Sequence, residues 1–493
     1  MQRLRKIQII LLVILLLILP SCKIQKTKVS KIDSEDILEI KRDYMVMNLS
    51  GEPLDLNPQT SSDSNSKQII SQIYQGLFYT ENDELKKGIV DEYKISDDGL
   101  VYKFTIKNTN WSDGKKLTAL DIKNSWMSVL NPENAVIQRD ELYNIVGARE
   151  YSKGMKSEEQ VEINVIDEQN LEVKLKELDQ NFIFKLSKMI YYPYRDEDTF
   201  SGPFKLDNWM HHKEIELSKN DYYWNQENVK LDKVIVKLMT GNVKPINEFA
   251  KGNVDLTTIP RQELYRYEGS DVLKHVSSHK TFALMFNLDN DITKNKELRA
   301  KIKQEFPFEV FLKEILNDYS GSVKSFFKGE IIEEFQKKDD DVILKNTNGK
   351  IKILTKNEDV SLKISAIVDQ ILTENGIESN VDTAVGGLYY DRLNKSEFDI
   401  AVVELNADKL NRNDFYQNFY SEGYYNYYSI KDIDDILRSN DNELIQKTID
   451  DKNYAIAISN GMKHYLFSNK YKNLRFINEG ILFLENVELV NID

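Results

Sequence analysis

Cysteine is almost absent from this chain of 493 residues, which contains only Cys22. No disulfide can form within the chain, so burial and hydrogen bonding must stabilise its fold. Histidine is also scarce, with five residues, which leaves few candidates for a general base. The patterns Gly-x-Ser-x-Gly and His-Glu-x-x-His and a glycine-rich phosphate loop are missing as well. We therefore expect a protein that is not an enzyme and that uses no cofactor.

Long apolar runs and excess positive charge are lacking too. The mean hydropathy is −0.50, and no second long apolar run follows the one near the N-terminus. Lys and Arg number 66 against 80 Asp and Glu, a net charge of −14 that argues against nucleic acid as a partner. Apolar residues make up 41% of the chain, with 26 Tyr and 21 Phe. This supply predicts a large core and more than one domain or lobe.

The N-terminal apolar run has the order of a secretory signal. A basic start precedes residues 9–19, which are apolar, and the run closes with Leu19-Pro20-Ser21-Cys22. This stretch is about half of the roughly 20 residues that a spanning helix needs. The segment resembles a bacterial lipoprotein signal, which implies acylation of Cys22 and a location on the outer side of the cell membrane. An ordinary signal peptide with a chance cysteine is the alternative, because Pro20 is uncommon at its position.

The first boundary lies just before Cys22, and the second lies near residue 40. We expect residues 1–21 to be the signal peptide and the lysine-rich residues 22–40 to be a polar tether, with the folded part starting near Asp43. Beyond that point strand and helix patterns alternate, which indicates an α/β protein. No period typical of a repeat protein is present.

Two stretches are well defined by their patterns. After the turn at 97–99, alternating apolar residues over 100–106 predict a strand. Thr118, with Asp121 three residues later, predicts the start of a helix that ends at Asn131-Pro132. Further on, a strand at 351–353, an apolar helical stripe over 364–372 followed by Gly376, and a buried strand over 398–403 predict a βαβ unit in a separate lobe.

Several short motifs together resemble the oligopeptide-binding proteins of ABC importers, which are solute-binding proteins of family 5. Singly each motif is weak, but they occur in the family's order over about 220 residues. They are Gly51-Glu52-Pro53, Tyr74-Gln75-Gly76-Leu77, Ser96-Asp97-Asp98-Gly99-Leu100, Trp111-Ser112-Asp113-Gly114, Gly202-Pro203-Phe204, Tyr223-Trp224, Leu231-Asp232-Lys233-Val234 and Lys251-Gly252 with Asp255. Phe398-Asp399-Ile400-Ala401 looks like the family's strand before its ligand-contacting loop.

The resemblance implies a two-lobed clamp of the periplasmic-binding-protein type (type II) with an extra subdomain. Lobe I would comprise residues 41–60, 196–275 and 473–493, with the subdomain at 61–195 and lobe II at 276–472. It also implies a monomer that binds a peptide between its lobes and delivers it to the permease subunits of an ABC transporter.

The resemblance also implies site residues. The family's acid for the peptide α-ammonium lies nine residues after the strand Asp, and Asp399 plus nine is Asp408. Such a carboxylate can pair with the amine while the peptide backbone bonds as an added strand. Ser62 and Ser64 match the family's peptide-contacting segment by position only. An exposed acid in a polar loop is the alternative for Asp408, because Glu404-Leu405 and Lys409 replace the family's usual neighbours.

Aromatic residues are distributed unevenly. All four tryptophans, at 111, 126, 209 and 224, lie in the first half of the chain. In the second half a tyrosine-rich run could line the ligand site or pack in the core; it contains Tyr416, Phe419, Tyr420, Tyr424, Tyr425, Tyr427 and Tyr428. We take Tyr424 as its candidate ligand contact.

His211-His212 is the one pattern that suggests a metal. Adjacent residues on a strand point to opposite faces, so we expect a solvated hairpin turn and no metal site.

Three other functions remain open beside peptide capture. The same fold could carry a metal chelate, haem or sugar. A divergent member could act as a surface interaction or signalling lipoprotein, since the motif around Asp408 is altered. Catalysis is the fourth reading, which the missing motifs disfavour.

Overall fold

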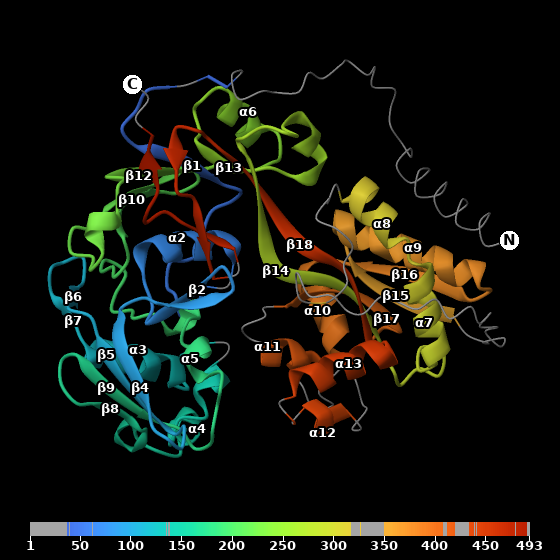
Figure 1. Ribbon diagram of the computed structural model, residues 1–493, viewed down its shortest axis with the longest axis horizontal. Coiled ribbons are helices and arrows are strands. Elements are labelled where there is room, and N and C mark those ends of the chain that lie inside the picture. The colour runs from blue at the N-terminus through green and yellow to red at the C-terminus, as the bar shows by residue number, and fades with distance from the viewer. Residues whose placement is uncertain are drawn as a thin grey trace. The chain divides into compact units, whose positions relative to one another are not determined.

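The computed structural model describes residues 37–38, 40–61, 63–134, 136, 139–316, 326, 350–407, 412–419, 433–437, 439, 441–478 and 480–490. It divides into two compact units, one with residues 29–276 and 463–493 and the other with residues 277–462. Two long strands, β14 (Leu273–Phe286) and β18 (Ala455–Phe467), have residues in both units (Figure 1).

The unit of residues 29–276 and 463–493 contains a mixed sheet in the order β10-β11-β12-β1-β13. Strand β1 runs parallel to β12 and β13, whereas β10, β11 and β12 pair antiparallel. All five residues of β1 are buried, as expected of a central strand covered on both faces. The bounds are β1 Met45–Leu49, β10 Phe204–Met210, β11 Glu214–Lys219, β12 Lys233–Leu238 and β13 Leu256–Thr258.

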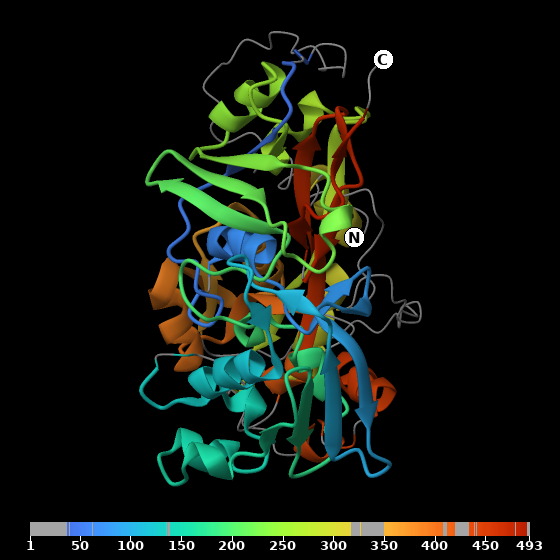
Figure 2. The same ribbon diagram turned by 90° about the vertical axis from the view of Figure 1, so that its left-hand side faces the viewer.

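The same unit contains a second, antiparallel sheet in the order β4-β5-β9-β8 (Figure 2). Its strands are β4 Val90–Ile95, β5 Val101–Ile106, β8 Ile163–Val165 and β9 Asn170–Lys174. The predicted strand over 100–106 is confirmed as β5, and the predicted helix is α3 (Ala119–Leu130). Asp121 caps the start of this helix, because its carboxylate accepts the Thr118 N–H at 2.7 Å and the Thr118 hydroxyl at 2.9 Å.

Shorter elements complete this unit. They are α2 Ser64–Ile73, β2 Phe78–Glu81, β3 Glu84–Lys87, β6 Thr109–Asn110, β7 Lys116–Leu117, α4 Ala148–Ser152, α5 Phe182–Lys185, α6 Lys244–Ala250, β19 Tyr471–Lys472, β20 Arg475–Ile477, β21 Ile481–Phe483 and β22 Glu488–Leu489.

Packing in this unit begins before Asp43. Ile37 packs against a buried cluster, and the Leu38 N–H donates to the Ala250 carbonyl at 3.1 Å. Gly252 has a φ of +73°, and a Cβ there would lie 2.0 Å from the Leu38 carbonyl oxygen. Only glycine fits this close approach, which explains the glycine of the Lys251-Gly252 motif.

The unit of residues 277–462 is built around strands in the order β14-β17-β15-β16. Strands β15, β16 and β17 are parallel, and β14 pairs antiparallel with β17. The strands are β15 Lys350–Lys356, β16 Glu378–Ala384 and β17 Ile400–Asn406, and the helices are α7 Lys296–Glu305, α8 Phe308–Val310, α9 Asp359–Glu374, α10 Gly386–Asn394, α11 Arg412–Tyr416, α12 Asp434–Leu437 and α13 Asn442–Lys452. Helices α9 and α10 pack against β15 and β16.

The predicted βαβ unit is correct in its two strands and its helix but wrong in how they are connected. Strand β17 is parallel to β15, and Gly376 follows α9 with a positive φ of 75°. However, β16 and α10 lie between α9 and β17 along the chain. The polar sequence ESNVDTA of β16 gave no strand signal, because this strand pairs on one side only and most of its side chains are at least partly exposed.

The predicted domain boundaries stay a prediction. The second unit starts at Ser277 and ends at Met462, whereas the sequence placed lobe II at 276–472.

Candidate functional site

The carboxyl ends of β15, β16 and β17 form one edge of the sheet in the unit of residues 277–462, which we call the carboxyl edge. Because the three strands are parallel, Lys356, Ala384 and Asn406, their last residues, lie at this same edge. Ligands of open parallel sheets bind at this side, where the loops that leave the strands meet. Strand β17 is followed by Ala407, and the predicted anchor Asp408 comes next in the sequence but lies outside the described residues.

Lys356 is held at the carboxyl edge by two tyrosines of α10. Its Nζ lies 5.5 Å from the centre of the Tyr389 ring and 5.0 Å from that of Tyr390. Tyr389 is buried, and its hydroxyl donates to the Val402 carbonyl of β17 at 2.7 Å. This bond attaches α10 to the sheet, while Tyr390 stays 45% exposed.

Lys356 is half-buried, yet it keeps its charge. Burial disfavours the ammonium form, but the nearby Tyr390 hydroxyl and the negative charges of Glu358 and Glu404 outweigh it, so the pKa of Lys356 is raised. Sequence reasoning missed this residue. A lysine that ends a buried strand was the available signal, but its ring partners depend on where α10 packs.

A cross-strand ion pair lies near the end of β17. Lys280 Nζ on β14 is 3.5 Å from Glu404 Oε2. At the start of the same strand Asp399 has a structural role, because its carboxylate accepts the Lys352 N–H and the Asn290 amide, each at 2.7 Å. The Asp of the family's strand motif therefore fixes β17 in the sheet.

The structure describes only one of the other predicted site residues. Ser64 is exposed and is the first residue of α2, next to the cap Asp63, whose carboxylate accepts the N–H groups of Asn65 and Ser66. Ser62, Tyr424 and the lipidation site Cys22 lie outside the described residues, as Asp408 does.

The tyrosine-rich run is core-packed at its start. Tyr416 and Phe419 are 1% and 0% exposed and belong to the core of the unit of residues 277–462. The alternative that these two residues line a ligand site is therefore wrong. The others, Tyr420, Tyr424, Tyr425, Tyr427 and Tyr428, lie outside the described residues.

The adjacent histidines occupy the turn between β10 and β11, as predicted. Both rings bond one carboxylate: His211 Nδ1 is 2.7 Å from Glu52 Oε1, and His212 Nδ1 is 2.6 Å from Oε2. Trp209 Nε1 also donates to Glu52 at 3.1 Å. Desolvation alone would raise the pKa of Glu52, but the bonds and charges of the two histidines outweigh it, so this pKa is lowered. The Gly51-Glu52-Pro53 motif is thus bonded to Trp209 and to the histidine turn.

A buried hydrogen-bond network joins two further motifs, those that contain Gln75 and Tyr223-Trp224, to Glu485. The Tyr223 hydroxyl lies 2.9 Å from Gln75 Oε1 and 2.7 Å from Glu485 Oε1, and Trp224 Nε1 donates to Gln75 at 2.6 Å. Burial and the Glu485 carboxylate raise the pKa of Tyr223, so its hydroxyl stays protonated and can donate. Arg475 bonds the other oxygen of Glu485 at 2.8 Å. These motif residues bond one another and stabilise the unit.

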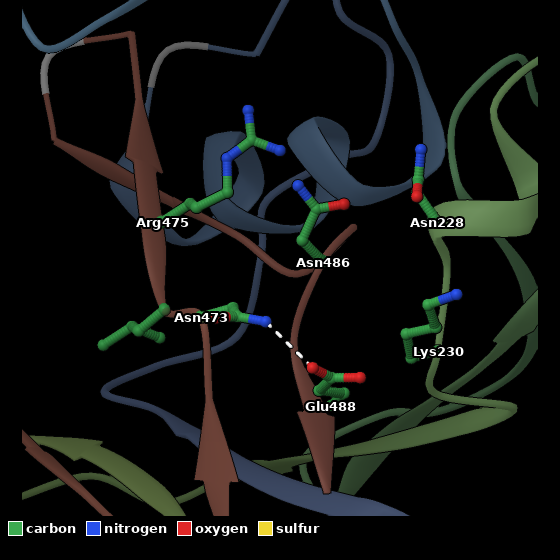
Figure 3. A pocket seen from close by; sticks show the side chains of 7 residues that line it. Asn228, Lys230, Asn473, Arg475, Asn486 and Glu488 are labelled. Atoms are coloured by element: carbon green, nitrogen blue, oxygen red, sulfur yellow. Dashed lines mark hydrogen bonds between the residues drawn. The ribbon is translucent and has the colours of Figure 1, made fainter.

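A surface cavity of about 450 Å³ lies beside this network. Its lining residues are Asn228, Lys230, Asn473, Leu474, Arg475, Asn486 and Glu488, and only Leu474 is apolar (Figure 3). Arg475 is bound to Glu81 and Glu485, Lys230 donates to the Glu227 carbonyl at 2.6 Å, and Asn473 donates to Glu488 at 3.1 Å. Since its charged groups are engaged within the protein, we do not assign this cavity to the ligand.

Among the described residues, no helix is long and apolar enough to cross a membrane. In the same part of the chain, no group of three or more His, Cys, Asp or Glu side chains could hold a metal ion.

Comparison with known proteins agrees with the fold. The chain is 24% identical over 398 residues to the oligopeptide-binding protein OppA of Bacillus subtilis, covering 72% of this chain and 73% of that protein. It is 24% identical over 241 residues, 45% of each chain, to a probable deoxycholate-binding periplasmic protein of Escherichia coli. The unliganded open form of the murein tripeptide-binding protein MppA superimposes with a TM-score of 0.76 at 17% identity, over 92% of this chain and 98% of that one.

These relatives are named as binding proteins and not as enzymes. The structural match confirms the two-lobed α/β fold. Residues 84–427 match the family described as bacterial extracellular solute-binding proteins, family 5, and this chain belongs to that family.

Proposed function

We propose that this protein is a lipid-anchored, extracytoplasmic binding protein that captures peptides and delivers them to the permease of an ABC transporter. The observation that carries the proposal is the carboxyl edge, where β17 leads into the segment that begins with Asp408. Membership of the solute-binding family and the names of the oligopeptide- and tripeptide-binding relatives support peptide as cargo. No step of this function requires catalysis.

In the proposed complex Asp408 pairs with the peptide α-ammonium, and Ser62, Ser64 and Tyr424 are further contacts. The backbone of a bound peptide offers donors and acceptors at a regular spacing, so a protein can bind many sequences through main-chain bonds. The terminal amine is the one charge that every unmodified peptide shares, which makes a carboxylate an anchor independent of sequence.

Calorimetry with short alanine peptides tests this function. Removing one partner of a buried pair typically costs roughly 3–5 kcal/mol, so Asp408→Ala should weaken binding about a hundredfold or more. N-acetylation of the peptide should weaken binding to the unmodified protein similarly. Asp391→Ala is the matched control, since Asp391 lies on α10 with an exposed partner, Lys395, at 2.8 Å. Equal affinity of the Asp408→Ala variant would remove Asp408 as the anchor, and no binding of any peptide would refute peptide capture.

The lipid anchor is tested separately in cells. Two acyl chains hold a protein stably at a membrane, whereas one chain binds only marginally. Cys22→Ser should therefore abolish labelling by a fatty-acid analogue and release the protein from the membrane fraction. Retention of both label and membrane association by the variant would rule out acylation at Cys22.

A non-peptide cargo is the second candidate, favoured by one observation. The E. coli relative is named for deoxycholate, an apolar body that carries a carboxylate. Mass spectrometry of the material that copurifies with residues 23–493 distinguishes the two: a series of short peptides supports the first function, and a single non-peptide compound supports the second.

A further inference from the structure

Lys356 differs from the neighbouring cations of its unit in what it bonds. On the same strand, Lys352 Nζ pairs with Asp382 at 3.1 Å, and Arg392 pairs with the same carboxylate at 2.5 Å. Lys280 pairs with Glu404. Lys356 forms no ion pair within 4.0 Å among the residues that the structure describes, and its contacts there are the two tyrosines of α10.

The surroundings of Lys356 suit a charged ligand atom. An ammonium has three N–H donors, which can bond the oxygens of a charged ligand group. The rings of Tyr389 and Tyr390 attract the cation and restrict its position, which lowers the entropy lost when a further bond forms. Because the side chain is half-buried, an ion pair here is screened less than one on an open surface.

The acids near Lys356 do not substitute for a ligand. Glu404 is bound to Lys280, and Asp382 is shared by Lys352 and Arg392. Glu358 is exposed at the start of α9 and forms no ion pair in the described part of the chain. No described acid pairs with this ammonium within 4.0 Å, so it can still form a charge-assisted bond with a further group.

We propose that Lys356, positioned by Tyr389 and Tyr390, binds a carboxylate of the peptide cargo and gives the protein a preference for peptides with a free acid at that position. This inference rests on the proposed function and names its ligand class more closely. The carboxylate could be the peptide's C-terminus or an acidic side chain, since both present the same two oxygens.

Four tetrapeptides separate these sources. They are tetra-alanine as the free acid, tetra-alanine amide, and the amides of Ala-Ala-Glu-Ala and Ala-Ala-Gln-Ala. Calorimetry with the unmodified protein should show roughly tenfold or stronger binding of the free acid over the amide, or of the Glu over the Gln peptide, according to the source.

The variants then assign the preference to one side chain. In Lys356→Met the ratio of the affinity for the charged peptide to that for its neutral counterpart should fall to about 1, while the affinity for the neutral peptides changes less than about twofold. Lys356→Arg should retain the preference. Lys352→Met is the matched control, because it removes a lysine four residues away on the same face of the same strand. The Lys352→Met variant should keep the affinity ratio of the unmodified protein.

Each outcome decides a different statement. If the unmodified protein binds the neutral peptides but shows no preference, or if Lys356→Met keeps the preference, the Lys356 assignment fails while peptide capture stands. If no tetrapeptide binds, the proposed function and the inference built on it both fail. A loss of affinity in Lys356→Met that is equal for charged and neutral peptides would show that Lys356 only stabilises the carboxyl edge. That result would overturn the assignment.

Discussion

The two units use the carboxyl ends of parallel strands in different ways. In the unit of residues 29–276 and 463–493, the chain leaves β1 towards Glu52, whose carboxylate is bonded by Trp209, His211 and His212. At the carboxyl edge of the other unit, Lys356 Nζ lies 5.5 Å and 5.0 Å from the centres of the Tyr389 and Tyr390 rings. The first arrangement satisfies its charge within the protein, whereas in the second we propose that the charge is met by a ligand. The same sheet geometry thus serves structure in one unit and, in our proposal, recognition in the other.

The largest expected effect concerns a buried charge in the unit of residues 29–276 and 463–493. Asp255 is fully buried, its Oδ2 lies 2.6 Å from Arg42 and 2.8 Å from the Val46 nitrogen, and its Oδ1 lies 3.4 Å from Lys470 Nζ. Asp255→Ala leaves two cations facing each other without their anion. We expect a loss of about 3–5 kcal/mol in the free energy of unfolding of this unit, measured by chemical denaturation.

The control for that change is Asp391→Ala, an exposed pair whose loss should cost less than about 1 kcal/mol. A comparable loss of unfolding free energy in both variants would show that the buried and the exposed charge contribute equally to stability.

A smaller effect is expected for the buried arginine of the unit of residues 277–462. Arg299 is 3% exposed and donates to the Thr293, Lys294, Lys452 and Asn453 carbonyls at 2.7–3.0 Å. Two of these carbonyls close the carboxyl end of α13, where a cation is favourable. Arg299→Met should destabilise this unit by roughly 2–3 kcal/mol in denaturant titration, since buried acceptors lose their donors.

Lys363→Met serves as the comparison for Arg299, because Lys363 belongs to a helix-surface pair with Asp359 and should contribute only about 0.3–0.5 kcal/mol. An unchanged denaturation midpoint in Arg299→Met would contradict the assigned role.

The smallest effect concerns Glu52, because both histidine partners are exposed, 69% and 90% for their side chains. The pKa of Glu52 is lowered in the folded protein, so its contribution to stability is present above its ordinary pKa of 4.5 and is lost as the pH falls through the folded value. Below about pH 4.5 the melting temperature of the unmodified protein should fall slightly more steeply than that of Glu52→Gln.

The exposed Glu443→Gln should not change this slope, and a carboxyl NMR titration should place the Glu52 midpoint below 4.5. A midpoint at or above that value would show that the histidines do not stabilise the charged form.

Local patterns predicted the fold wherever a strong signal was present. The alternation over 100–106 and the Thr118–Asp121 pair specified β5 and α3, because strand period and helix caps depend on nearby residues alone. Strand β16 and helix α10 were missed, since the former is polar and the latter opens with Gly386-Gly387. Their formation depends on packing against β15, which no local pattern encodes.

The candidate site was less predictable than the fold. The sequence located β17, after which Asp408 follows, but it gave no reason to single out Lys356. The role of Lys356 depends on Tyr389 and Tyr390, more than thirty residues later in the chain, and on the Tyr389 bond that fixes α10 to β17. Contacts between distant segments of this kind are a product of tertiary packing.

The packing of Ile37 limits how far the folded body can stand from Cys22. Ile37 lies fifteen residue steps after Cys22, and a fully extended chain spans at most about 3.3–3.6 Å per step. If Cys22 is acylated as proposed, the folded body can stand no more than about 50 Å from the membrane surface, within reach of a membrane-embedded partner. The polar tether would then raise the local concentration of the protein near the membrane. A weak affinity for that partner would suffice for frequent encounters.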